Sequence, residues 1–221
     1  MTTLREMSIA VPLPQGAVAV DATVHEPQHP RATVVVAHGA GTRHDHPFLL
    51  GFASALCEAG LRAVRFNFPY AQAGRRMPGP AAHAIAAWRA VAAAVGSELP
   101  LFAAGRSYGG RMASMAAADG LIEPAGLVYL GYPLHPPGRP DRLRVEHLPR
   151  IAAPQLFLSG TRDPFVDPHE QLEEAVAACR RADLQWVDGG GHGFDVAGRR
   201  RAAEKIGADL AVPVRAWIDA L

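Results

Sequence analysis

LFAAGRSYGGRMASMAAA, residues 101–118, is the stretch that decides the fold of this chain. Its apolar start, 101–104, predicts a buried strand, and its end has apolar residues at helical spacing. Between them stands GRSYG (105–109), so a serine between two glycines joins a strand to a helix. Such a turn is sharp and strained, and it exposes the serine hydroxyl. The pattern indicates that Ser107 is a nucleophile; the alternative is a glycine-rich turn with an incidental serine.

Length and composition limit the class of protein. The chain has 221 residues, of which 49% are hydrophobic and 19% charged, and this predicts one globular domain over 1–221. A net charge of +1 gives no sign of a nucleic-acid or anionic membrane partner. Residues 1–10 lack the apolar core of a signal peptide, and the apolar helix expected over 81–95 is too short to span a bilayer. We therefore expect a soluble, cytoplasmic protein.

Lys205 is the only lysine, and the many arginines and alanines suggest a GC-rich bacterial genome.

Strand-like and helix-like segments alternate along the chain. This alternation predicts an α/β fold, with a mostly parallel sheet covered by helices on both faces. An edge hairpin is expected over 7–11 and 17–25, and further strands over 32–37, 61–68, 101–104, 126–130, 155–159 and 184–187. Helices are expected over 47–60, 80–96, the end of 101–118, 169–181 and 199–221, the last with a break near Pro213. Residues 131–154 are too few for a substantial cap domain.

Polar side chains follow three of these strands in the order Ser107, Asp163, His192. Ligands of open parallel sheets bind beyond the carboxyl ends of the strands, where these residues would meet. A serine hydroxyl is a weak nucleophile near neutral pH and needs an adjacent base. Imidazole can take the proton and return it to a leaving group, while a carboxylate holds the imidazole in one tautomer. The three residues are therefore predicted to form a catalytic triad.

Other interpretations of two of these residues stay open. Asp163 precedes Pro164 and could be a turn residue. Asp167 and Asp188 are rival acids, although Asp188 stands only four residues before His192, which is too local for the usual geometry. His192 itself could be structural.

An acyl-transfer site also needs donors for a developing oxyanion. The backbone N–H of Tyr108, directly after the serine, is one candidate. The loop HGAG (38–41) offers the other, with Ala40 as first choice and Gly41 as second. No cofactor is expected, since no Gly-x-Gly-x-x-Gly follows a strand and there is no Walker lysine. No metal is expected, since RHDH (43–46) has no helical i, i+4 histidine pair and no cysteine partner.

Seven strings together make the chain resemble the α/β-hydrolase superfamily. They are AHGAG (37–41), DHPF (45–48), RFNFP (65–69), GRSYGGR (105–111), LGYPLHPPG (130–138), GTRDPF (160–165) and GHG (191–193). More narrowly, the chain resembles the KANL3/Tex30-type hydrolase-like family, near the dienelactone-hydrolase branch. The resemblance implies an eight-stranded sheet and a triad of Ser107, Asp163 and His192. Dienelactone hydrolases use a cysteine nucleophile, so the serine argues against that particular activity.

We therefore expect a serine hydrolase, a carboxylesterase or thioesterase that acts on small acyl substrates. With no substantial cap, its site should be open and shallow. Tyr132 and His135 are expected at the rim, and further substrate contacts are expected from Gly41, Tyr70, Phe165 and Phe194. For His135 the alternative is a loop histidine packed on prolines. The alternative function is a non-catalytic protein-interaction module on a hydrolase fold, and the oligomeric state stays open.

Overall fold

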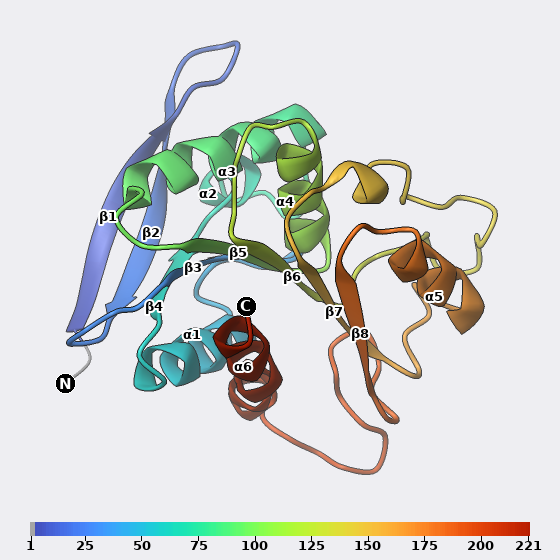
Figure 1. Cartoon of the computed structure of the whole chain (residues 1–221). Helices are drawn as coiled ribbons and strands as arrows, with labels where there is room; N and C mark the ends of the chain where they lie inside the picture. Colours follow the sequence, from blue (N-terminus) through green and yellow to red (C-terminus); the bar gives the residue numbers. More distant parts are fainter. Residues whose placement is uncertain (1–2) are drawn as a thin grey trace.

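The structure is a computed structural model that describes residues 3–221 (Figure 1). The strands are β1 (Thr3–Val11), β2 (Val18–Glu26), β3 (Thr33–Ala37), β4 (Arg62–Phe66), β5 (Leu101–Arg106), β6 (Gly126–Leu130), β7 (Gln155–Gly160) and β8 (Ala182–Val187). The helices are α1 (Pro47–Glu58), α2 (Pro69–Gln72), α3 (Ala81–Val95), α4 (Tyr108–Ala118), α5 (His169–Ala177) and α6 (Ala203–Asp219), with a 3₁₀ turn at Leu148–Arg150.

The strands form one sheet in the order β1-β2-β4-β3-β5-β6-β7-β8. Every neighbouring pair from β4 to β8 is parallel, whereas β1 pairs antiparallel with β2, and β2 with β4. The sheet is therefore mostly parallel with an antiparallel hairpin at one edge, which confirms the predicted fold class. Because the parallel strands point the same way, the loops after β3, β5, β7 and β8 meet at one edge of the sheet.

Helices cover both faces of the sheet (Figure 1). The central strand β3 shows why, because all five of its residues are buried and successive side chains point to opposite faces. Val34 and Val36 pack in the core under α1 and α6, while Val35 and Ala37 pack in the core under α3 and α4. Such a run of β-branched residues is typical of a parallel strand buried on both sides.

The structure differs from the sequence-based expectation at several places. The short helix α2 was not expected, and β1 starts at Thr3 rather than at residue 7. The C-terminal helix begins at Ala203, and Pro213 lies inside it without ending it. Proline costs a helix about 3 kcal/mol, but the buried face of α6 packs along α1, and this tertiary contact outweighs the local preference. None of the helices within residues 3–221 is long and apolar enough to cross a membrane.

The helices α1 and α6 touch through two glycines. A Cβ built on Gly51 would lie 1.9 Å from the carbonyl oxygen of Glu204, and one built on Gly207 would lie 1.9 Å from that of Phe48. Each glycine therefore admits the backbone of the other helix. This close approach holds the C-terminal helix against the first helix of the domain.

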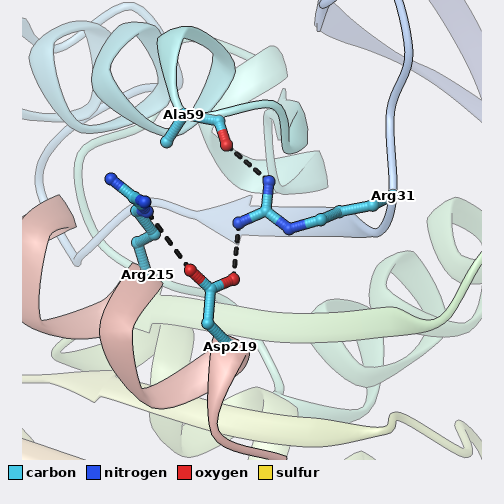
Figure 2. A network of polar contacts seen from close by, with 4 residues as sticks. All are labelled: Arg31, Ala59, Arg215 and Asp219. Carbon is cyan, nitrogen blue, oxygen red and sulfur yellow. Dashed lines mark hydrogen bonds and ion pairs between the residues drawn. The ribbon is translucent and has the colours of Figure 1, made fainter.

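A polar network fastens the end of α6 to the start of β3 (Figure 2). Arg31 donates to the carboxylate of Asp219 and to the carbonyl of Ala59, each over 2.5 Å, and Arg215 donates to the other carboxylate oxygen over 3.2 Å. The Arg31 and Asp219 side chains are 43% and 36% exposed, so their ion pair contributes at most about 1 kcal/mol. The helix contact, rather than this network, is the main source of stability here.

Replacing Gly207 by alanine should destabilise the domain, because the new methyl group would collide with the α1 backbone. We expect the free energy of unfolding to fall by at least about 2 kcal/mol, more than the ~1 kcal/mol that alanine gains in a helix. Urea denaturation measures the change, and Val212→Ala, at an exposed position of the same helix, is the control. Equal stability of Gly207→Ala and the parent protein would contradict the close helix contact.

Candidate active site

Ser107 lies between β5 and α4 in a backbone conformation that side chains rarely adopt. Its φ is 49° and its ψ is −115°, and it immediately precedes the first helical residue, Tyr108. Its N–H donates to the carbonyl of Leu130 on the neighbouring strand. The strain expected from the GRSYG pattern is thus present at the serine itself.

Two glycines beside Ser107 make this turn possible. A Cβ built on Gly105 would lie 2.2 Å from the backbone nitrogen of Gly110, and one built on Gly109 would lie 2.6 Å from the carbonyl oxygen of His38. Backbone atoms cannot move aside as a flexible side chain can. Both positions must therefore lack a side chain if the first turn of α4 is to pack on β5 and on the end of β3.

The structure brings Ser107, His192 and Asp163 into one chain of hydrogen bonds. The Nε2 atom of His192 lies 2.8 Å from the Ser107 hydroxyl, and its Nδ1 atom lies 2.7 Å from a carboxylate oxygen of Asp163. A carboxylate only accepts, so Nδ1 carries the proton and Nε2 presents its lone pair to the serine. This is the arrangement in which an imidazole can take a proton from a hydroxyl.

Asp163 is held rigidly for this contact. Its side chain is fully buried, and its second carboxylate oxygen accepts from the backbone N–H of Phe165 over 2.9 Å. The rival acids do not approach the imidazole in the same way. Asp167 is exposed, and the exposed Asp188 accepts from the hydroxyl of Thr161 instead.

The ring of Phe165 stacks on the His192 imidazole, with 4.1 Å between the ring centroids and 28° between the planes. The His192 side chain is 23% exposed, so the stack covers one face of the ring while the site stays open to solvent. Of the substrate contacts expected from the sequence, Phe165 is the one that touches the hydrogen-bonded chain.

The loop after β3 abuts the serine. A Cβ built on Gly39 would lie 3.7 Å from the Cβ of Ser107. The carbonyl oxygen of Gly39 is fixed by His38 Nδ1 at 2.8 Å and by the hydroxyl of Thr42 at 3.0 Å. In the planar trans peptide that follows, the N–H of Ala40 points opposite to that carbonyl.

The buried side chain of His38 holds the Gly39 carbonyl in this orientation, although His38 is not among the site residues expected from the sequence. The backbone N–H of Phe68 donates to its Nε2 over 3.1 Å, so Nδ1 carries the proton that is donated to Gly39. The ring is fully buried, and burial lowers its pKa to about 4. The position of a histidine directly at the end of a strand was the available signal.

Gly41 is turned away from an anion-binding role, because its N–H donates to the carbonyl of Arg76 over 3.0 Å. Ala40 is exposed and lies in the loop beside Ser107. Tyr108 opens α4, and the first N–H groups of a helix have no acceptor inside the helix. The geometry therefore favours the first choice, Ala40 with Tyr108, over Gly41.

Comparison with known proteins agrees with this fold. Residues 30–218 match the family model described as an alpha/beta hydrolase domain. The chain belongs to this family. A dienelactone hydrolase of Anabaena variabilis has a similar structure, with 20% identity, a TM-score of 0.76 and 98% of each chain covered. An α/β serine hydrolase without lid from Xanthomonas campestris is 23% identical, with a TM-score of 0.71 and 96% of this chain and 95% of that chain covered.

A longer relative matches by sequence. A putative phosphoribosyl transferase of Mycobacterium tuberculosis is 29% identical over 202 residues, which are 88% of this chain and 44% of that protein. The chain thus spans less than half the length of this curated relative.

The prediction that Tyr132 and His135 lie at the rim of the site was wrong. Tyr132 and His135 are both fully buried. Tyr132 packs against Tyr129 and Phe157, and its hydroxyl donates to the carbonyl of Arg144 over 2.8 Å. His135 contacts the carbonyl of its neighbour Pro136 over 2.9 Å, which agrees with the alternative of a histidine packed in a proline-rich loop.

Two further aromatic residues expected to contact substrate are also buried. Phe194 is 2% exposed and stacks on Phe48 in the core under α1, so it supports the loop of His192 from behind. Tyr70 packs against His38 and Tyr108, and it borders a cavity of about 230 Å³ between the edge hairpin, α2 and α3. Phe194 is thus corrected from a surface contact to a core residue.

Three neutral histidines, of which His25 and His38 are buried and His147 is partly buried, should make the domain sensitive to acid. Burial is the main cause that lowers the pKa of His25, His38 and His147 from 6.5 to about 4. The unfolded chain binds these protons as the pH falls below about 6.5, whereas the folded chain does not until about 4. The free energy of unfolding should therefore fall by about 2 kcal/mol or more between pH 7 and 5.

Urea denaturation across this pH range measures how steeply the free energy of unfolding falls as the pH falls. His147→Gln should make this dependence on pH shallower, while His29→Gln, at an exposed loop position, should leave it unchanged. A free energy of unfolding that stays level from pH 7 to 5 would contradict the neutral state of these imidazoles.

Proposed function

We propose that this protein is a serine hydrolase that cleaves small carboxylic esters or thioesters. The observation that carries the proposal is the hydrogen-bonded chain from Ser107 through His192 to Asp163, at 2.8 and 2.7 Å. A serine at a strained turn, an imidazole of fixed tautomer and a buried carboxylate are the groups that acyl transfer needs. We further propose that the chain falls in the KANL3/Tex30-type branch of the family.

Acylation of the serine begins the reaction. The Ser107 Oγ atom bonds to the acyl carbon while its proton passes to Nε2 of His192. The charge that develops on the former carbonyl oxygen is held by the backbone N–H groups of Ala40 and Tyr108. The bond to the alcohol or thiol then breaks, and the leaving group takes the proton from Nε2.

Water completes the cycle. It gives one proton to Nε2 of His192 and adds to the acyl carbon of the ester formed with Ser107. Collapse of this second intermediate breaks the bond to Oγ, which recovers the proton from the imidazole, and the free acid leaves. Asp163 stays ionised throughout and stabilises the imidazolium formed in each half.

The absence of a large cap supports small substrates. Residues 131–154, where a cap would be inserted, contain only one 3₁₀ turn and fold back on the domain through buried side chains. Nothing in this segment builds a long enclosed channel for an acyl chain. Short acyl groups that need little coverage are therefore the proposed substrates, and water is the proposed acceptor.

Ser107→Ala should lower kcat/KM for 4-nitrophenyl acetate and butanoate by at least about 10³-fold, because the nucleophile is gone. Ser97→Ala, at an exposed position before β5 and so at the opposite end of that strand from Ser107, is the matched control. Initial rates and labelling by a fluorophosphonate probe give independent measurements. Equal turnover by the Ser107→Ala variant and the parent would reject the proposal.

Asp163→Asn should lower kcat by about 10³ to 10⁴-fold, because an amide can stabilise the wrong tautomer of His192 and cannot balance the imidazolium. Asp167→Asn and Asp188→Asn test the rival acids and should stay within about threefold of the parent. Steady-state rates on 4-nitrophenyl butanoate distinguish the three variants. A larger loss for either rival would reassign the acid of the triad.

A further inference from the structure

A cavity of about 230 Å³ lies next to Tyr108, the residue that directly follows the proposed catalytic serine. The turn between β1 and β2, the segment 69–80 and the first turn of α3 form its walls. Much of its lining is apolar, with the side chains of Leu13, Val18, Pro69 and Ala84. Such a lining favours an apolar group over a charged one, because a charge would lose its hydration there.

The polar residues of the lining lie in two places. Gln15 and Arg75 are exposed, so they stand at the mouth of the cavity. Tyr70 and Tyr108 lie against each other deeper in, with 6.2 Å between the ring centroids and 80° between the planes.

The hydroxyl of Tyr108 is buried and has no hydrogen-bond partner within residues 3–221. Burial also raises the pKa of Tyr108 to about 12, so the hydroxyl keeps its proton and can donate it in a hydrogen bond. A buried donor without an acceptor is unfavourable. A bound group with an oxygen atom in this cavity would supply the missing acceptor.

The walls of the cavity are joined to the loop after β3. The hydroxyl of Tyr70 donates to the carbonyl of Gly39 over 3.4 Å, and the segment 69–80 accepts from the N–H of Gly41 at its Arg76 carbonyl. Gly39 in turn abuts the serine, since a Cβ built on it would lie 3.7 Å from the Cβ of Ser107. The cavity therefore borders the place where the carbonyl group of a substrate would bind.

The cavity and the imidazole lie on opposite sides of Ser107 along the sheet (Figure 1). Ser107 follows β5, whereas Asp163 and His192 follow β7 and β8. The cavity lies on the other side of β5, where the β1–β2 hairpin and α2, the helix after β4, are found. The imidazole gives its proton to the leaving group, so the leaving group faces His192. The acyl group then extends toward the cavity.

We propose that this cavity binds the acyl group of the substrate, and that this acyl group contains a single ring with a hydrogen-bond acceptor. The inference rests on the proposed hydrolase function and names its substrate class. A cavity of about 150 Å³ can hold benzene, so one of 230 Å³ has room for a phenyl ring with a small substituent. The perpendicular rings of Tyr70 and Tyr108 offer it edge and face contacts, and the Tyr108 hydroxyl donates to its acceptor.

The size of the acyl group is tested with two esters of one leaving group, 4-nitrophenyl 3-phenylpropanoate and 4-nitrophenyl acetate. The parent should prefer the phenylpropanoate by about tenfold or more in kcat/KM, because the ring becomes buried. Ala84→Leu and Gly79→Leu add bulk to the cavity wall, and each should lower this preference by about tenfold. Ala82→Leu, at an exposed position of α3 outside the cavity, should keep the preference of the parent.

Melting temperatures show which variants have folded. Ala84 is 2% exposed, so a leucine there can also disturb the core. Gly79→Leu avoids this difficulty, because a Cβ built on Gly79 meets no atom within 4 Å. Equal rates of the parent on the two esters, or an unchanged preference in the folded cavity variants, would overturn the acyl site.

The acceptor is tested with 3-(methoxyphenyl)propanoate esters and ethylphenyl esters of the same shape, substituted at position 3 or 4 of the ring. The parent should prefer the methoxy member at one of these positions by about fivefold, since only that member accepts a hydrogen bond. Tyr108→Phe should abolish this preference. Both esters are measured on the same variant, so any change at the Tyr108 N–H cancels. A missing preference, or one that survives Tyr108→Phe, would overturn the assigned acceptor.

Binding without catalysis distinguishes failure of this inference from failure of the hydrolase proposal. Methyl 3-(4-methoxyphenyl)propanoate should raise the melting temperature of Ser107→Ala, and equally that of Ser107→Ala with Ala82→Leu. It should not raise that of Ser107→Ala with Gly79→Leu. If the parent hydrolyses none of the esters while this pattern is present, the hydrolase proposal fails and the binding cavity stands. Hydrolysis without preference, and without this stabilisation, would overturn the cavity and leave the hydrolase proposal intact.

Discussion

The contact between two pieces of backbone, the end of β5 and the first turn of α4, is the constraint on which the site depends. Gly105 and Gly110 approach so closely that a Cβ on either would lie within 2.7 Å of the other's backbone. This contact forces the chain to reverse within one residue, and Ser107 takes up the strain at φ 49°. Because the turn is this tight, α4 begins directly after the serine, and the partial positive charge of its first N–H groups faces the site.

Fixed contacts hold the groups that lie around this turn. His38 fixes the loop after β3, the Phe165 N–H fixes the carboxylate of Asp163, and the stacked ring of Phe165 restrains the imidazole. These supports come from two strand ends, the loop after β3 and the loop after β7, so the sheet itself sets the spacing of the reactive groups. Preorganised groups of this kind need little rearrangement when charge develops during a reaction.

The sequence predicts the fold well where the signals are local. The buried run 32–37, the GRSYG turn and the polar residues after later strands each appear within a few positions, and the sheet follows from their alternation. The misplaced residues depend on packing between distant segments. Tyr132 and His135 lie in an irregular loop, and nothing local shows that this loop folds inward. The continuity of α6 through Pro213 is likewise set by tertiary contacts.

The close contact of α6 with α1 at Gly51 and Gly207 has a consequence for biosynthesis. The half of the core under α1 contains residues from β3, β5, β6 and β7, but it is closed by the last helix of the chain. During translation the part of this apolar surface that α6 covers stays exposed until residues 203–219 have left the ribosome. The nascent chain therefore passes through a stage in which all strands are made while part of one face of the sheet is still open to chaperones or to aggregation.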